Sequence, residues 1–252
     1  MTTIVSGNVR KVAYGIARRL LPSDNNFWRV YSPVIRILKD SYEHRAIREK
    51  IGKYFDLRKT DIVLEEGCGR AIWAQEIEAQ VASVTGLDNE EKMLAVAREQ
   101  SPSISFVQAD LNHPLPFMDG QFTKIGSILV EGYLRERETA RAERFRILAP
   151  GGMLAIVTPR KGARFFKVLQ AEARHRTEEK TFIANIRKLP LGIIAILFGK
   201  VAEIKAVVGD WHFYEKEELI NFYREAGFEP IACESVYADQ AWLLVVRKPS
   251  LD

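Results

Sequence analysis

Apolar positions along the chain form short runs that alternate with longer amphipathic stretches. Runs that end in polar or turn residues occupy residues 61–66, 83–88, 104–110, 122–130 and 153–159. Between them lie stretches such as 89–100 and 138–148, where apolar residues recur at helical spacing. Strands that alternate with helices in this way predict a mostly parallel sheet with helices on both faces.

The C-terminal part of the chain follows a different pattern. Residues 215–228 predict a helix that Gly227 closes, and residues 228–237 and 240–248 predict two strands that pair with each other. The predicted fold class is therefore α/β, a Rossmann-like, doubly wound sheet of seven strands. We expect it to be mostly parallel with an antiparallel C-terminal strand, and to carry N-terminal helices and a helical lid insertion.

Length and composition fit one α/β domain over residues 1–252, since 252 residues with 47% hydrophobic content can bury a sizeable core. We expect four parts: an N-terminal helical cap, a ligand-binding core, a substrate lid insertion, and a C-terminal helix with a strand pair. Their predicted bounds are 1–54, 55–160, 161–210 and 211–252.

Cysteine and histidine usage argues against disulfides and metal. The two cysteines, Cys68 and Cys233, are too few for a disulfide framework, and no Cys/His cluster has zinc-site spacing. The N-terminus lacks the apolar region of a signal peptide, and the run Leu189–Gly199 is too short to span a bilayer. These features predict a cytoplasmic protein without a bound metal.

Charge is unevenly placed along the chain. Residues 1–60 carry 13 Lys/Arg against 5 Asp/Glu, and residues 160–205 carry 11 against 4, whereas the remainder is acidic. Such asymmetry indicates an anionic partner or peripheral contact with an anionic membrane surface, and solvated helix faces are the equally weighted alternative.

The stretch IVLEEGCGRAIW, residues 62–73, links the first predicted strand to a helix. Ile72 stands where a dinucleotide-binding loop has its third glycine, and the lysine of a phosphate-binding P-loop is missing. Gly67 and Gly69 still let the backbone approach a ligand, and Glu65 suits an ammonium group. The ligand is therefore expected to carry positive charge near this loop.

Two aspartates end the next two predicted strands. Asp88 can accept both hydroxyl groups of a ribose, and Asp110 can accept the amino group of an adenine edge. An ammonium site, a ribose site and an adenine site in strand order together describe S-adenosylmethionine.

Five motifs in order carry a family resemblance: VLEEGCGRA, VTGLDNEEKMLAVARE, FVQADLNHPLPFMDGQF, RILAPGGMLAIVTP and EELINFYREAGFE. Over residues 55–160 and 211–248 the chain resembles the class I S-adenosylmethionine-dependent methyltransferases, in particular the type 11 group with quinone and phospholipid methyltransferases. The resemblance implies that S-adenosylmethionine is converted to S-adenosylhomocysteine.

The resemblance also implies a set of cofactor-binding residues. Glu65 and the loop glycines would contact the methionine part, Asp88 the ribose, and Met93 the adenine face, with Asp110 on the adenine edge. The whole set is Glu65, Gly67, Cys68, Gly69, Asp88, Asn89, Met93, Asp110 and Leu111.

The chain departs from the family pattern in the loop and at the start of the fourth predicted strand. Glu65 and Glu66 replace the usual aspartate and apolar residue, Ala71 replaces the last glycine, and Thr123 stands where an aspartate is usual. Glu65 keeps the charge of aspartate and Ala71 adds only a methyl group, so we expect cofactor binding to be retained.

Four residues are candidates for substrate contact or proton removal. Glu131 and Tyr133 follow the fourth predicted strand at the mouth of the site, and His212 precedes a helix. Tyr31 lies in an N-terminal element that, by resemblance, would cap the cofactor. The alternatives are a solvated loop acid for Glu131, a role in shaping the lid for His212, and core packing for Tyr31.

The sequence indicates the methyl acceptor less specifically than it indicates the cofactor. The segment SILVEGYL, residues 127–134, lacks the motif of enzymes that methylate amino groups of bases, which disfavours nucleic acid. The insertion 161–210 combines basic residues with the run Leu189–Gly199, so we predict a small hydrophobic acceptor such as a quinone, isoprenoid, polyketide or lipid. A cyclase or isomerase on the same fold, and a cofactor-binding protein without catalysis, remain alternatives. Acceptor atom and oligomeric state stay open.

Overall fold

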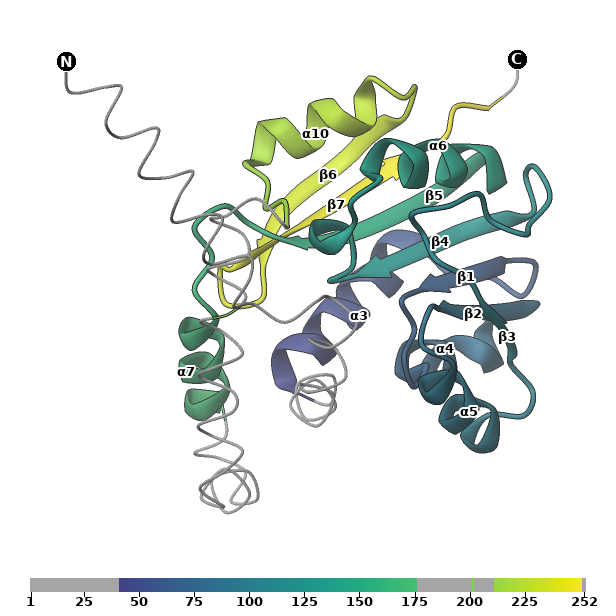
Figure 1. Ribbon diagram of the computed structural model, residues 1–252, viewed down its shortest axis with the longest axis horizontal. Coiled ribbons are helices and arrows are strands. Elements are labelled where there is room, and N and C mark those ends of the chain that lie inside the picture. Colours follow the sequence, from purple (N-terminus) through teal and green to yellow (C-terminus); the bar gives the residue numbers. More distant parts are fainter. Residues whose placement is uncertain (1–40, 176–200, 202–210, 251–252) are drawn as a thin grey trace, which may run out of the picture. The chain divides into compact units, whose positions relative to one another are not determined.

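A computed structural model of the chain describes residues 41–175, 201 and 211–250 (Figure 1). Its contacts divide the chain into two compact units, one formed by residues 43–163 with 213–252 and one by residues 1–42 with 164–212. The first unit contains the whole sheet. Most of the expected cap and of the expected lid insertion lies outside the described residues.

The sheet has seven strands in the order β3-β2-β1-β4-β5-β7-β6. Strands β1 to β5 run parallel, and β7 pairs antiparallel with both β5 and β6. This arrangement confirms the predicted fold class. The strands are β1 Ile62–Glu66, β2 Ser83–Asp88, β3 Ser105–Gln108, β4 Phe122–Ile128, β5 Leu148–Pro159, β6 Glu229–Val236 and β7 Ala241–Arg247.

Helices cover both faces of this sheet. Figure 1 shows α6 and α10 on one face and α3, α4 and α5 on the other. A further helix, α7, belongs to the other compact unit. The helices are α3 Tyr42–Phe55, α4 Ile72–Ile77, α5 Glu91–Gln100, α6 Arg137–Ile147, α7 Phe165–His175 and α10 Lys216–Arg224, and short 3-10 turns span Glu78–Gln80 and Glu131–Tyr133.

The core is centred on β5 and β7. Leu154 and Ile156 of β5 and Leu244 and Val246 of β7 are fully buried and pack in one cluster with Tyr223 of α10. Strand β5 begins five residues before the predicted start, because Leu148 already pairs with Phe122 across an irregularity in the β4–β5 register.

Helix α10 shows how local sequence sets an element. Glu215 and Glu218 form a reciprocal capping box at its start, so two backbone N–H groups that would lack partners are bonded. After the helix, Gly227 adopts a φ of 89°, which favours glycine, and its N–H donates to the carbonyl of Arg224. The prediction that Gly227 closes this helix agrees with that geometry.

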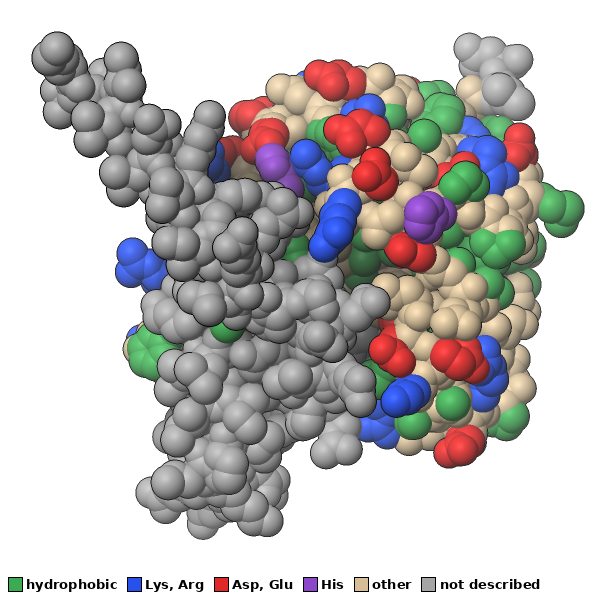
Figure 2. Space-filling view, viewed as in Figure 1, with side chains coloured by type: hydrophobic (Ala, Val, Ile, Leu, Met, Phe, Trp, Pro, Cys, Tyr) green, Lys and Arg blue, Asp and Glu red, His purple; other side chains and the backbone are tan. Residues whose placement is uncertain are grey.

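Within the described residues, no helix is both long enough and apolar enough to cross a membrane. The run Leu189–Gly199 falls outside those residues. So do Arg10, Lys11, Arg18 and Arg19, the basic residues nearest the N-terminus. On the described part of the face seen in Figure 2, acidic and basic side chains are interspersed.

Candidate active site

The loop between β1 and α4 has the backbone conformation of a ligand cradle. Gly67, Gly69 and Ala71 have φ values of 60°, 56° and 56°. Left-handed backbone is easy for glycine and costs an alanine about 1–2 kcal/mol. Ala71, the N-cap of α4, stands where the family has its last glycine and adopts the left-handed conformation despite this cost.

Gly67 is also required by space. A Cβ built on Gly67 would come closer than 3.0 Å to a methyl group of Val130, which follows β4. The loop backbone therefore lies directly on the segment that leaves β4. Glycine at this position is therefore needed for the loop to pack against Val130.

Glu65 and Asp88 hold this loop from two sides. Oε2 of the buried Glu65 accepts the N–H of Ala74 in the first turn of α4 at 2.9 Å, where a helix N-terminus favours negative charge. The carboxylate of Asp88, at the end of β2, accepts the N–H of Gly69 at 2.8 Å and that of Glu90 at 2.9 Å. Carboxylate oxygens have several acceptor positions, so Asp88 can bind ribose hydroxyls and still hold the loop.

The residues predicted for the adenine side lie along the ends of β2 and β3. Asp110 is partly exposed and accepts the backbone N–H and the side-chain amide of Asn112 at 2.9 and 2.7 Å. The remaining members of the set differ in exposure: Cys68 and Leu111 are buried, Met93 on α5 is half-buried and Asn89 is exposed. The structure thus brings the whole set to the carboxyl ends of the first three strands.

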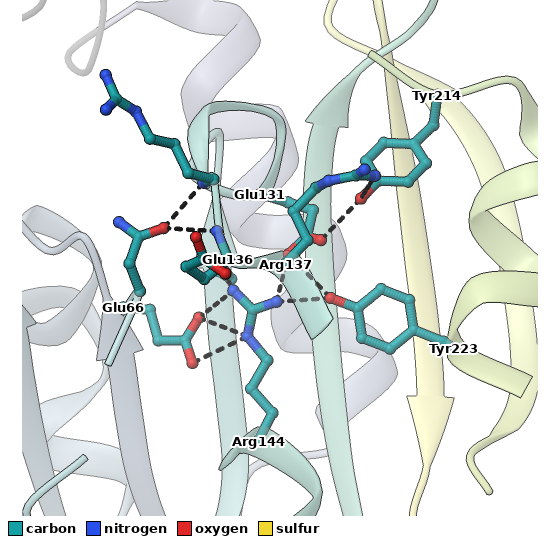
Figure 3. A network of polar contacts seen from close by, with 10 residues as sticks. Glu66, Glu131, Glu136, Arg137, Arg144, Tyr214 and Tyr223 are labelled. Atoms are coloured by element: carbon teal, nitrogen blue, oxygen red, sulfur yellow. Dashed lines mark hydrogen bonds and ion pairs between the residues drawn. The ribbon is translucent and has the colours of Figure 1, made fainter. Parts of the chain in front are cut away.

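On the other side of the β1 terminus lies a buried polar network around Arg144 of α6 (Figure 3). Nε of Arg144 donates to both oxygens of Glu66 at 3.1 and 2.9 Å, and Nη2 donates to Oε2 of Glu66 at 2.7 Å. Its Nη1 donates to Glu131. The hydroxyl groups of Tyr214 and Tyr223 donate to Glu131 at 3.0 and 2.9 Å.

Burial shapes the charge of this network. The side chains of Arg144, Glu66 and Glu131 are 0% exposed. Burial alone would lower the pKa of Arg144, but Glu66, Tyr223 and Glu131 outweigh it and raise that pKa well above its ordinary value. Burial is the main cause that raises the pKa of Tyr214, and the negative charge of Glu131 raises it further. The Tyr214 hydroxyl therefore keeps its proton at neutral pH.

Glu131 is therefore fully enclosed, and both of its oxygens already accept hydrogen bonds. Sequence reasoning placed it at the mouth of the site but missed its partners. Glu66 and Arg144 were not among the predicted site residues. The one signal for them was Glu66 itself, a second carboxylate in a strand position where the family has an apolar residue.

Tyr133 ends the turn that Glu131 begins. Its N–H donates to the carbonyl of Val130 at 3.0 Å, and its ring meets Phe213 edge-on at a centroid distance of 6.2 Å. Burial raises the pKa of the Tyr133 phenol, so it is protonated at neutral pH. Tyr133 lies two residues from Glu131, on the strand end that also carries Val130.

The other two candidates are not brought into this unit. His212 belongs to the second compact unit, and Tyr31 lies outside the described residues. Among the residues that the structure does describe, no group of three or more His, Cys, Asp or Glu could hold a metal ion.

Comparison with known proteins agrees with this geometry. The sequence model of a family described as a methyltransferase domain matches residues 64–156, which run from the cofactor loop through β5. The demethylmenaquinone methyltransferase of Staphylococcus epidermidis (strain RP62A) is 28% identical over 210 residues, which cover 77% of this chain and 78% of the relative.

Solved structures share the fold at low identity. A methyltransferase in complex with the Trm112 activator of Haloferax volcanii superposes with a TM-score of 0.65 at 16% identity, covering 91% of this chain and 99% of that one. Geranyl diphosphate C-methyltransferase of Streptomyces coelicolor A3(2), solved with S-adenosyl-L-homocysteine, gives 0.58 at 13%, covering 81% and 78%. The cyclase SpnF gives 0.57 at 17%, covering 82% of each chain.

Residues 64–156 match a methyltransferase domain, and the relatives and the shared fold support a class I S-adenosylmethionine-dependent methyltransferase. It is a methyltransferase, and its cofactor is S-adenosylmethionine. Gly67 and Asp88 lie at the ends of β1 and β2, where the family resemblance predicts the cofactor site.

Proposed function

We propose that the enzyme transfers a methyl group to a small hydrophobic acceptor of the quinone or isoprenoid type. The observation that carries this proposal is the likeness to demethylmenaquinone methyltransferase, which extends over about three quarters of both chains. A fold shared with geranyl diphosphate C-methyltransferase is compatible with an isoprenoid acceptor. The run Leu189–Gly199 lies outside the described residues, and its apolar composition is compatible with an apolar acceptor.

The cofactor would lie across the carboxyl ends of β1, β2 and β3. Gly67 and Gly69 would bring their backbone against its methionine part, where Glu65 provides negative charge. Asp88 would accept the ribose hydroxyls, and Asp110 the adenine amino group. Cys68, Asn89, Met93 and Leu111 complete the proposed set.

The cofactor supplies a methyl group on a positively charged sulfur, which keeps the electron pair of the broken bond. The acceptor atom forms the new bond with its own electron pair. If that atom carries a proton, the proton passes to a base. Holding two reactants in line supplies effective molarities on the order of 10⁵ M or more, so positioning can do much of the work.

Proton removal is proposed for Tyr133, His212 or Tyr31, the three other candidates from the sequence. Tyr133 is protonated at neutral pH, since burial raises the pKa of its phenol, and in that form it would orient an acceptor oxygen rather than act as a base. Glu131 is held by Arg144 and two tyrosines, which favours a supporting role over direct proton transfer.

A direct test uses a naphthoquinol probe, a reduced naphthoquinone with a geranyl chain and no ring methyl group. The purified enzyme is incubated with S-adenosylmethionine and this probe. Mass spectrometry should show S-adenosylhomocysteine and a probe heavier by one CH2 unit in equal amounts. The same ring without the geranyl chain is the matched control and should react far more slowly.

Three outcomes separate the alternatives. Equal turnover with and without the geranyl chain contradicts a hydrophobic acceptor. Conversion of the probe without S-adenosylhomocysteine would point to a cyclase or isomerase. Cofactor binding with no turnover of any quinol or prenyl compound contradicts the proposed acceptor class. A cytoplasmic location with peripheral membrane contact remains a prediction that vesicle sedimentation would test.

A further inference from the structure

The Arg144 network joins segments that are far apart in sequence. Arg144 comes from α6, Glu66 from the end of β1, Glu131 from the turn after β4, and Tyr223 from α10. Nη1 of Arg144 also donates to the hydroxyl of Tyr223 at 2.6 Å, and Nη2 to the hydroxyl of Ser127 in β4 at 3.3 Å. One guanidinium therefore ties two neighbouring strand ends to both helices on this face of the sheet (Figure 3).

The two carboxylates flank the contact between the cofactor loop and the acceptor side. Glu66 directly precedes Gly67, and Glu131 directly follows Val130. Gly67 and Val130 are themselves in close contact, with no room for a Cβ between them. Arg144 therefore bridges these two segments of the chain immediately beside the contact between Gly67 and Val130.

Stability alone is a weak reason for a buried network of this kind. Buried ion pairs often contribute little net stability, because desolvation of the charges offsets their attraction. What they impose is geometry, since a planar guanidinium with fixed donor directions accepts few arrangements of its partners. Here that geometry sets the position of Glu131 relative to Glu66, and hence of the turn that ends at Tyr133.

We propose that Arg144 is a positioning residue for methyl transfer. Through Glu66 and Glu131 it fixes the turn Glu131–Tyr133 against the cofactor loop, so that the acceptor side keeps its distance from the transferable methyl group. This role rests on the proposed methyl transfer to an acceptor. It also explains Glu66, which replaces an apolar residue of the family pattern.

Substitution of Arg144 by lysine tests this positioning role, because lysine keeps the positive charge but lacks the planar guanidinium with its fixed donor directions. Arg146→Lys is the matched control: it changes the next arginine of α6, which pairs with Glu143 and Asp119 at the surface. With the naphthoquinol probe, Arg144→Lys should lower kcat about 100-fold, since misplacement of roughly 1 Å can have that effect. Its affinity for S-adenosylhomocysteine should change about threefold or less, and Arg146→Lys should resemble the parent.

Amide hydrogen exchange gives a readout that needs no acceptor. The N–H groups of Leu129, Tyr133 and Leu134 are bonded to Val157, Val130 and Glu131 within or beside this turn. In Arg144→Lys these amides should exchange about tenfold faster. We expect S-adenosylhomocysteine to slow their exchange in the parent and to leave it unchanged in the variant. If only the proposed acceptor is wrong, the parent will fail to methylate the probe while this exchange difference persists.

Several results would overturn the positioning role. A folded Arg144→Lys enzyme with the kcat of the parent would refute it. Amide exchange that rises equally over all helices would also refute it, because such a rise indicates a general loss of stability. If Arg144→Lys does not fold, Tyr223→Phe removes one hydroxyl, which donates to Glu131 and accepts from Arg144, and should give a smaller effect confined to the same amides. Parent-like exchange in a folded Tyr223→Phe then refutes the proposal.

Discussion

The contact between Gly67 and Val130 gives a quantitative prediction about the cofactor loop. Gly67→Ala places a methyl group at a φ of 60°, which costs about 1–2 kcal/mol for an L-residue. The same methyl would meet the side chain of Val130 at less than 3.0 Å, and overpacking of this kind costs about 1–3 kcal/mol. Gly67→Ala should therefore lower the free energy of unfolding by about 2–5 kcal/mol.

Val130→Ala separates the two costs. Alone it removes two partly buried methyl groups and should cost about 1 kcal/mol. In the double variant the clash is relieved while the backbone cost remains, so the double variant should be more stable than the sum of single effects predicts by about 1–3 kcal/mol. Gly52→Ala in α3 is the control, because nothing lies within 4 Å of its added Cβ. It should stabilise by about 0.5–1 kcal/mol.

Urea unfolding of the four variants, with S-adenosylhomocysteine affinity from titration calorimetry, measures this cycle. Gly67→Ala should also weaken the ligand, and Val130→Ala should restore part of that loss. Additive costs in the double variant, or a cost below about 1 kcal/mol for Gly67→Ala, would show that the loop does not rest on Val130 and would refute the reasoning.

Three further predictions concern the cofactor, acid stability and metal. Asp88→Ala should weaken S-adenosylhomocysteine roughly 10- to 100-fold in calorimetry, because charge-assisted hydrogen bonds contribute about 1.5–3 kcal/mol, and unchanged affinity would contradict the ribose assignment. The Arg146 guanidinium holds the pKa of Glu143 below its usual 4.5, so Glu143 stabilises the fold above that pH and less as the pH falls below it. Glu143→Gln should accordingly cost stability at neutral pH and progressively less in acid, whereas a pH-independent cost in urea unfolding would contradict the linkage. A chelator should leave turnover of the naphthoquinol probe unchanged, since displacement at a sulfonium needs no Lewis acid; loss of turnover that added magnesium or zinc restores would refute this.

The departures from the family pattern differ in their structural meaning. Ala71 retains the left-handed backbone of the glycine it replaces, and Glu65 bonds to the first turn of α4 beside the loop. Thr123 accepts the N–H of Ile62 at 3.0 Å and donates to Asp61 at 2.7 Å, so it joins the starts of β1 and β4. Glu66 forms a buried ion pair with Arg144 of α6.

The sequence by itself determined the order of elements and the strand-end residues. Alternating apolar runs are a local property, and parallel strands bring their carboxyl ends to one edge, so Gly67, Asp88 and Asp110 could be grouped without coordinates. The C-terminal strand pair followed for the same reason, because two apolar runs joined by a short turn pair with each other. Helix α10 was predictable because its closing glycine lies within the element's own sequence.

Tertiary structure alone decided which side chains meet across distant elements. Glu66 and Arg144 are 78 residues apart, and their contact depends on where α6 crosses the sheet and on the face to which each strand residue points. Hydrophobic periodicity carries no information about such a crossing. Glu131 was therefore expected at the mouth of the site, as a substrate contact or a solvated loop acid, although it is fully enclosed. The cradle at Gly67 was likewise only half visible in the sequence: the glycine permits the loop, but the side chain of Val130, brought in by the next strand, makes it necessary.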